Sequence, residues 1–263
     1  TAFNKVFLAS MLPLVIVSVR EDLLLNTKPV QRLIGIFASS AIIIFYLVPQ
    51  LPIIDLPFLS LFINISPVNF IFFILVLSLL INGMNLIDGS NGLSAFTSLA
   101  TIVALGIIAH LYNDNVTANS CLIFGTILVS FLIFNYPYGK IFLGDTGAYI
   151  NGIIIGYLLI NFYGKHPEIP TWSAVLLVFY PIMEVIFSFF RKILSKKSPF
   201  YPDSKHLHIK LYKILNKGMN DKYINSNYLI TPFLSILWLG PAMTATISFT
   251  SISMSIYMII FFI

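Results

Sequence analysis

Long apolar runs recur along this 263-residue chain and constrain its fold more than any other feature. Several have the roughly 20 residues that an α-helix needs to cross a bilayer core about 30 Å thick. We expect spans near residues 3–19, 33–51, 68–86, 92–112, 119–136, 148–163, 170–190, 229–248 and 251–263. The sequence therefore predicts an all-α, polytopic integral membrane protein with about nine transmembrane helices.

The composition agrees with a membrane protein and excludes an ordinary soluble domain. Hydrophobic residues make up 58% of the chain and charged residues only 10%, whereas soluble domains carry about 25% charged residues. The single cysteine, Cys121, lies in an apolar run, where a thiol behaves as a small buried hydrophobe. It therefore gives no information about the redox compartment.

The positions of the cations indicate how the chain is oriented in the membrane. Alternation of nine spans places residues 20–32, 87–91, 137–147 and 191–228 on one side. Of the fifteen Lys and Arg residues, only Lys5 and Lys165 fall outside these loops. Because short cytoplasmic loops are enriched in Lys and Arg, we expect this set of loops to face the cytoplasm.

Four polar segments lie on that predicted cytoplasmic side, each at the end of a span. They are "VREDLLLNTKPVQR" from Val19, "NGMNLIDGSNGLS" from Asn82, "KIFLGDTGAY" from Lys140 and "SPFYPDSKHLHIKLYKILNKG" from Ser198. Taken singly, each is compatible with an ordinary turn, a solvated charge pair or a lipid-contacting basic loop. Their occurrence on the same face favours a site that opens to the cytoplasm.

The residue types in these segments point to phosphate chemistry. Amide and carboxylate oxygens, such as those of Asn85 and Asp145, suit Mg²⁺ or Mn²⁺. The neighbouring glycines let backbone N–H groups approach phosphate oxygens, and the basic loop adds Lys and His side chains. We expect phosphoryl transfer from a soluble phosphorylated donor to a lipid acceptor. A further acid, Glu184, lies in or near the end of a span, where ionisable groups tend to be functional.

The four segments resemble the polyprenyl-phosphate N-acetylhexosamine-1-phosphate transferases, the glycosyltransferase family 4 enzymes. "NGMNLIDGSNGLS" resembles the signature N-x-x-N-x-x-D-G-x-D/N-G-L, and "FLGDTGAY" resembles F-x-G-D-x-G-S. "PIMEVIFSFFRK" and "SPFYPDSKHLH" resemble its Pro-x-x-Asp, Arg and H-x-H-H region.

The resemblance runs from about Val15 to Gly218 in the family's order. It implies a fold of ten or eleven helices, so we expect residues 1–263 to form one transmembrane catalytic domain that is incomplete at both ends. Residues 191–228 would be a basic cytoplasmic loop within it.

The resemblance implies roles for matching residues of this chain. Asn85 and Asp145 would hold Mg²⁺, with Mn²⁺ as the alternative metal. Asp22, with Glu21 beside it, would deprotonate or order the lipid phosphate, and Asp88 would support the metal and phosphates. The remaining implied substrate contacts are Asn82, Asn91 and Phe142 near the nucleotide, and His206, His208 and Arg191 near the diphosphate or the sugar.

The implied reaction moves N-acetylhexosamine-1-phosphate, most often GlcNAc-1-phosphate, from a UDP-sugar to undecaprenyl phosphate and releases UMP. It would start lipid-linked surface polysaccharide synthesis, such as that of O-antigen and lipopolysaccharide, at the cytoplasmic face of the bacterial inner membrane. The expected partners are the UDP-sugar, undecaprenyl phosphate and the lipid bilayer, with no nucleic acid. A homodimer is one option for the assembly.

Several departures from the family pattern leave alternatives open. Glu21 and Glu184 stand where the family usually has aspartate, Ile209 replaces the third histidine, and Ala148 replaces a serine. A catalytically inactive scaffold of the same fold is therefore one alternative. A transporter is another, although the charged residues gather at one surface and no internal repeat is visible. A CDP-alcohol phosphotransferase would need a D-x-x-D-G-x-x-A-R pattern, which this sequence lacks.

Overall fold

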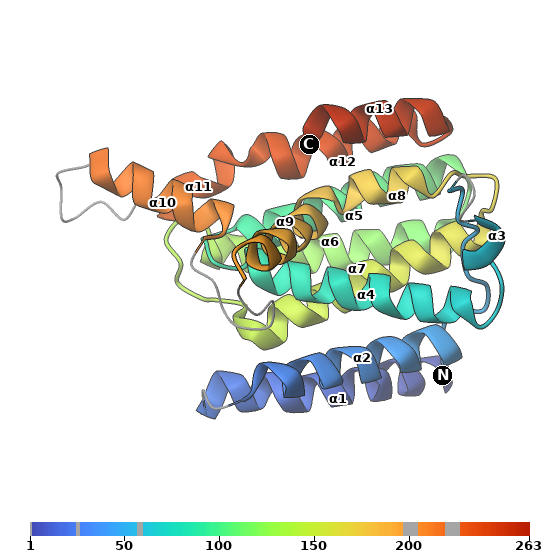
Figure 1. Cartoon of the computed structure of the whole chain (residues 1–263), viewed down its shortest axis with the longest axis horizontal. Helices are drawn as coiled ribbons and strands as arrows, with labels where there is room; N and C mark the ends of the chain where they lie inside the picture. The colour runs from blue at the N-terminus through green and yellow to red at the C-terminus, as the bar shows by residue number, and fades with distance from the viewer. Residues whose placement is uncertain (1, 25–26, 57–59, 197–204, 219–226) are drawn as a thin grey trace.

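The computed structural model describes residues 2–24, 27–56, 60–196, 205–218 and 227–263, and every regular element in these ranges is a helix. The long helices run back and forth along one axis, as Figure 1 shows. The helices are α1 (Ala2–Leu24), α2 (Pro29–Tyr46), α3 (Ser60–Ile63), α4 (Val68–Ile87), α5 (Leu93–Leu111), α6 (Asn115–Asn135), α7 (Gly144–Lys165), α8 (Trp172–Leu177), α9 (Phe179–Leu194), α10 (Leu207–Gly218), α11 (Asn227–Phe233), α12 (Ser235–Ser248) and α13 (Ile252–Phe262).

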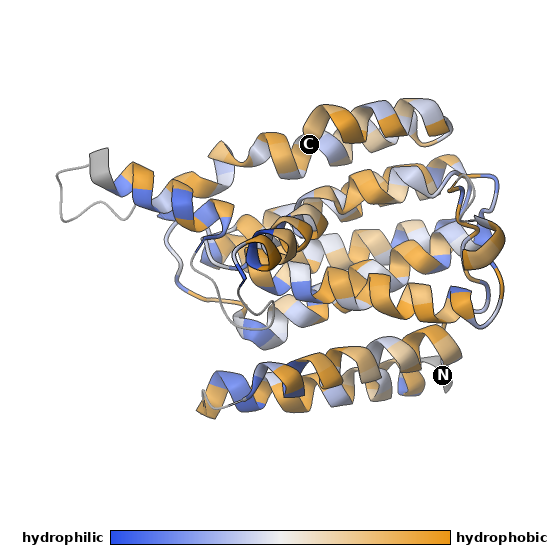
Figure 2. Ribbon diagram, in the orientation of Figure 1, coloured by the Kyte–Doolittle hydropathy of each residue, from blue (hydrophilic) through white to orange (hydrophobic). Residues whose placement is uncertain are grey.

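Six helical segments of the described chain are long and apolar enough to cross a membrane. They are 29–46, 68–87, 93–111, 115–135, 144–165 and 227–248, each close to a predicted span. The other three predicted spans fall on α1, on the pair α8 and α9, and on the 11-residue α13. In Figure 2 apolar residues fill the middles of the helices, and hydrophilic residues gather at the bundle ends. The prediction of an all-α, polytopic membrane protein is confirmed.

Helices α4 and α7 form the centre of the bundle, and buried side chains spread from them to two sides. One apolar cluster joins them to α1 and α2, and the other joins them to α5, α6, α8, α9 and α12. The two helices approach closely because Gly152 of α7 has no side chain. A Cβ added to Gly152 would lie 2.7 Å from the Cα of Ile81 in α4. The α4–α7 pair therefore fixes where the polar ends of these helices lie.

The predicted span 170–190 is broken at Val178, where α8 ends and α9 begins. Pro181 has no backbone N–H, so it cannot donate to the carbonyl of Leu177 four residues earlier. The hydroxyl of Thr101 in α5 lies 2.6 Å from that carbonyl and donates to it instead. In Figure 1 α9 leaves the direction of α8 and turns toward the viewer. The break thus redirects α9 at the centre of the bundle.

Substituting Gly152 by alanine should lower the stability of the protein, because the added Cβ would press on the α4 backbone. We expect the free energy of unfolding in detergent to fall by about 1–3 kcal/mol, the usual cost of overpacking. Gly125→Ala is the matched control, because a Cβ on Gly125 would lie 3.8 Å from its nearest neighbours. Equal stability of the two variants, measured by thermal unfolding, would contradict the proposed close α4–α7 contact.

Candidate functional site

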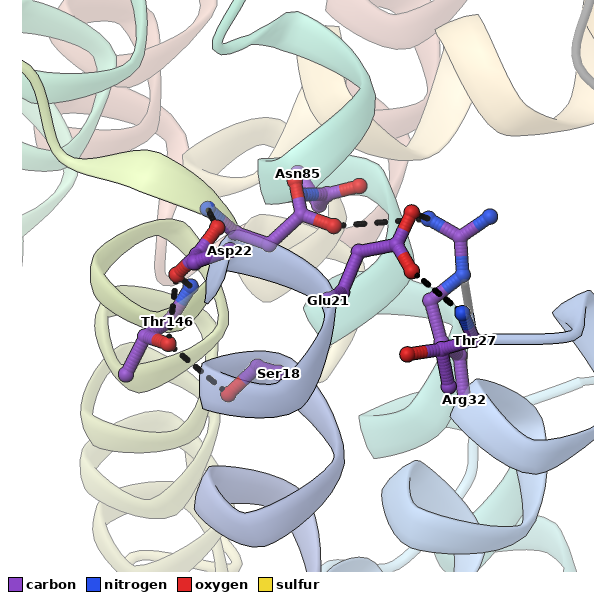
Figure 3. A network of polar contacts seen from close by, with 8 residues as sticks. Ser18, Glu21, Asp22, Thr27, Arg32, Asn85 and Thr146 are labelled. Carbon is purple, nitrogen blue, oxygen red and sulfur yellow. Dashed lines mark hydrogen bonds and ion pairs between the residues drawn. The ribbon is translucent and has the colours of Figure 1, made fainter. Parts of the chain in front are cut away.

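The two acids at the end of α1, Glu21 and Asp22, contact different partners. Asp22 reaches the first turn of α7, where its carboxylate accepts from the backbone N–H of Asp145 at 3.0 Å and of Thr146 at 3.2 Å. The Thr146 hydroxyl donates to the same carboxylate at 2.7 Å and also contacts the Ser18 hydroxyl. Figure 3 shows Asp22 turned toward Thr146 and Glu21 turned toward Arg32. Asp22 therefore caps the N-terminus of α7, where a negative charge is favourable.

Asp145 connects three helices through its side chain. Its Oδ1 accepts from Nδ2 of Asn85 in α4 at 2.8 Å, and its Oδ2 accepts from Nη1 of Arg32 in α2 at 3.3 Å. The structure therefore brings together the two residues predicted to hold a metal, Asn85 and Asp145, although they are 60 residues apart in the chain.

Arg32 is the main cation of this cluster. Besides its bond to Asp145, Arg32 donates a hydrogen bond to the Tyr149 side chain. Its Nη1 also lies 4.0 Å from Oε1 of Glu21. The other oxygen of Glu21 accepts from the backbone N–H of Thr27 at 2.9 Å. One guanidinium therefore balances part of the negative charge of two carboxylates. The sequence alone assigned Arg32 only to the orientation of the chain in the membrane.

Asp88 follows the last residue of α4 and is partly buried. Burial, and secondly the negative charge of Asp145, raise the pKa of Asp88 to about 8. Asp88 therefore holds a proton at neutral pH unless a cation compensates its charge. A site that keeps a second carboxyl close to Asp145 at this cost is suited to a positively charged ligand.

A cavity of about 430 Å³ lies beside this cluster, lined by residues of α2, α4, α7, α9 and the start of α10. Its lining is partly polar and partly apolar. Its polar lining consists of Arg32, Asn82, Asn85, Asp88, Tyr149, Ser188, Lys192, His206 and His208, and its apolar lining includes Leu33, Ile36, Leu86, Val185, Phe189 and Ile209. Arg32 and Asn85 connect the cavity to Asp145, which lies behind them.

The two histidines of the basic loop lie side by side in the wall of this cavity. The rings of His206 and His208 are nearly parallel, with centroids 5.9 Å apart and an interplanar angle of 8°. Both side chains are buried. Nδ1 of His206 is 3.0 Å from Oε1 of Glu184 in α9. His208 covers Gly89, and a Cβ on Gly89 would collide with Nε2 of the imidazole.

Other residues predicted as substrate contacts lie at varying distances from the cavity. Asn82 lines it. The Asn91 amide donates to the Pro137 carbonyl at 2.8 Å, so its NH₂ group ties the turn before α5 to the loop before α7. Phe142 is 73% exposed in that loop. Arg191 contacts the Ser188 hydroxyl at 3.4 Å and does not line the cavity. The roles expected of these four residues stay predictions.

Sequence reasoning left three lining or supporting residues out of the site. Arg32 and Lys192 were counted as cytoplasmic charges. Glu184 was noted as an acid in or near the end of a span, where ionisable groups tend to be functional, but no contact was assigned to it. The burial of Glu184, 7% exposed, agrees with that expectation. Arg32 had no comparable signal in the sequence, because its partners come from other helices.

The donor set fits a hard divalent cation that shares its coordination with a ligand. Among the described residues, no three His, Cys, Asp or Glu side chains form a ready metal cluster. Mg²⁺, however, is usually held by only one or two carboxylates and otherwise by water and substrate phosphates. The partly buried, protonated Asp88 beside Asp145 is the observation that favours a cation here, because a metal would compensate both carboxylates.

A second cavity, of about 340 Å³, lies toward the opposite end of the bundle, between α4, α7, α8 and α9. Its lining is almost entirely apolar and includes Phe72, Leu77, Leu159, Trp172 and Ile186. Ile186 follows Val185, which lines the polar cavity. α9 therefore contributes to both cavities.

The chain is similar to several proteins of known activity. One is the undecaprenyl-phosphate alpha-N-acetylglucosaminyl 1-phosphate transferase of Thermotoga maritima, which is 29% identical over 138 residues. The aligned region covers 52% of this chain and 41% of that relative. The probable undecaprenyl-phosphate N-acetylglucosaminyl 1-phosphate transferase of Bacillus subtilis is 30% identical, over 49% of this chain and 37% of the relative. The decaprenyl-phosphate N-acetylglucosaminephosphotransferase of Mycobacterium leprae is also 30% identical, over 51% and 39%. The matched part thus spans about two fifths of each relative.

The family comparison covers more of the chain than any of these relatives. The model of glycosyl transferase family 4 matches residues 5–163, more than half of the 263 residues. This range includes the Asp22, Asn85, Asp88 and Asp145 positions, which the structure gathers at one end of the bundle. The chain therefore belongs to glycosyl transferase family 4.

Proposed function

We propose that the protein transfers N-acetylhexosamine-1-phosphate, most often GlcNAc-1-phosphate, from a UDP-sugar to a polyprenyl phosphate such as undecaprenyl phosphate. The observation that carries this proposal is a polar cavity at one end of an apolar bundle, where Asn85, Asp88 and Asp145 meet Arg32 and the two histidines. The activities for which the relatives are named support the same reaction class. The product would start the synthesis of a lipid-linked surface polysaccharide such as O-antigen.

In the proposed reaction, an oxygen of the lipid phosphate attacks the phosphorus that carries the sugar. The bond between this phosphorus and the oxygen bridging the two phosphates breaks, and UMP leaves with the bonding electrons. Such transfers need positioning and charge stabilisation more than covalent help from the protein. The lining of the cavity offers both, with carboxyl and amide groups on α4 and cationic or hydrogen-bonding groups on α2, α9 and α10.

Asn85 and Asp145 would hold Mg²⁺ or Mn²⁺, and the bound metal would neutralise charge on the diphosphate. Arg32 would contact the phosphates from the α2 side, because it already bonds to Asp145 and lines the cavity. The histidines would contact the diphosphate or the sugar from the α10 side.

Asp22 would order the acceptor end of the site. Both of its oxygens accept hydrogen bonds from the start of α7, and these three bonds hold the carboxylate against that helix. This geometry favours a role in holding the α7 N-terminus toward the lipid phosphate over a role as a base. The isoprenoid chain of the acceptor would lie among apolar side chains such as those of the second cavity.

Removing the charge of Asp145 should abolish most of the transfer. Membranes containing the protein would receive undecaprenyl phosphate, Mg²⁺ and a panel of UDP-N-acetylhexosamines, and UMP release would be followed with and without EDTA. We expect metal-dependent UMP release with one donor, and a loss of about a hundredfold or more in Asp145→Asn. Glu168→Gln, at an exposed carboxylate that lines neither cavity, is the control and should keep its activity.

The outcomes of this assay separate the proposed enzyme from its alternatives. Absence of UMP with every donor, from protein that is correctly folded, would favour an inactive scaffold of the same fold. Full activity of Asp145→Asn would exclude Asp145 from the metal site. Activity that resists EDTA would exclude the metal.

Metal binding at pH 7 should release a proton from Asp88. The pKa of Asp88, raised to about 8, lies above the working pH, so the carboxyl is protonated and must ionise when a cation binds. We expect calorimetric titration with Mn²⁺, in buffers of different ionisation enthalpy, to show release of up to about one proton at pH 7 and less at pH 9. Asp88→Asn should bind without this release, and an unchanged release would show that another group titrates.

We propose that the cavity opens to the cytoplasm in the bacterial inner membrane. A cysteine in place of Tyr138, which is 83% exposed near the cavity end of the bundle, should then react with an impermeant thiol reagent only from the cytoplasmic side. A cysteine in place of the exposed Asn115, at the start of α6, should react only from the opposite side. Native Cys121 is buried and should contribute little labelling. Reversed accessibility of the two positions would overturn the orientation.

A further inference from the structure

Glu184 is a buried carboxylate that has no role in the reaction as described so far. It lies in α9, two turns after the break at Val178, and is 7% exposed. One of its oxygens, Oε1, accepts two hydrogen bonds, from Nδ1 of His206 at 3.0 Å and from the backbone N–H of Leu207 at 2.9 Å. A buried carboxylate is costly unless such donors compensate it.

The two hydrogen bonds serve different purposes. Leu207 is the first residue of α10, so the bond to its N–H caps this helix with a negative charge. The bond to His206 fixes the ring, because an ionised carboxylate can only accept. Nδ1 of His206 must therefore carry the hydrogen, and Nε2 is the nitrogen that is left for the cavity.

The second histidine depends on the same anchor. His208 follows on α10, and its ring is nearly parallel to that of His206 and lies over Gly89 beside Asp88. Burial lowers the pKa of His208 to about 4, so its ring is neutral at neutral pH. Its buried Nδ1 has no hydrogen-bond partner among the described residues. The position of both rings in the wall of the cavity thus follows from where Glu184 holds the start of α10.

We propose that Glu184 is the positioning residue of the histidine pair, holding His206 in the Nδ1–H form with Nε2 left to accept a hydrogen bond from a hydroxyl or N–H group of the donor sugar. The part of this inference that concerns the donor rests on the proposed function. The part that concerns the tautomer rests only on the contacts of Glu184, so the two parts can fail separately.

Glu184→Leu removes the oxygen that accepts both hydrogen bonds. Glu184→Gln keeps it, because the Leu207 N–H can only donate and so favours the amide oxygen at the Oε1 position, where this oxygen also accepts from Nδ1 of His206. Glu184→Asp keeps the carboxylate and provides the conservative rescue. Glu168→Gln is the matched control, because Glu168 is 54% exposed in its side chain and contacts His166.

The tautomer can be read directly from ¹⁵N spectra of the histidine-labelled protein in bilayers, with His206→Gln used to assign the signal. We expect a protonated Nδ1 in the unaltered protein, in Glu184→Asp and in Glu184→Gln, and its loss in Glu184→Leu. A residue that only anchors α10 would leave this signal the same in all variants. Retention of the Nδ1–H signal in Glu184→Leu would overturn the proposal.

Transfer kinetics test the functional part. We expect kcat/KM for the UDP-sugar to fall by about 10–100-fold in Glu184→Leu, as when a partner that orients a functional histidine is removed. KM for the polyprenyl phosphate should change little, and Glu184→Asp should recover most of the loss. A changed tautomer with unchanged transfer would overturn the assignment of His206 to the donor. An Nδ1–H signal in a protein that releases no UMP would support the tautomer and overturn the proposed function.

Discussion

The close approach of α4 and α7 is the constraint on which the rest of the structure depends. Gly152 lets the α7 backbone lie against Ile81 of α4, and the buried clusters on both sides of the bundle pack against this pair. The two helices run in opposite directions, so the C-terminal end of α4 and the N-terminal end of α7 meet. The Asn85–Asp145 hydrogen bond is the polar continuation of that contact. A displacement of either helix by a fraction of its width would separate the proposed metal ligands.

The polar end of the bundle illustrates how charges are kept at the edge of an apolar protein. Three acids, Glu21, Asp22 and Asp145, are each compensated in a different way: by Arg32 with a backbone N–H, by the start of α7, and by Arg32 with an amide. Asp88 is compensated by none of these and is protonated instead. Compensation by fixed groups keeps these three acids ordered, whereas the carboxyl of Asp88 can respond to a cationic ligand.

The sequence predicted the helical fold and the gathering of the four polar segments, because apolar length and motif spacing are local properties. The described residues of those segments, including Asp22, Asn85, Asp145 and His206, indeed lie at one end of the bundle. The sequence did not predict the contacts of Arg32 or Glu184, since these depend on which side of one helix faces another. Nor did it predict the break at Val178, because Pro181 alone is also compatible with one continuous, kinked span. The contact of Thr101 with the Leu177 carbonyl comes from another helix and is not visible in the sequence.

The break in the α8–α9 span joins three residues that are far apart in the chain. Pro181 leaves a carbonyl unbonded, Thr101 bonds it, and Gly83 of α4 lacks the Cβ that would lie 2.6 Å from the Pro181 carbonyl oxygen. Thr101 compensates for the N–H that Pro181 lacks, and Gly83 leaves room for the Pro181 carbonyl. Across related chains, we therefore expect a proline at this position to occur together with a hydroxyl-bearing residue at position 101 and a glycine at position 83.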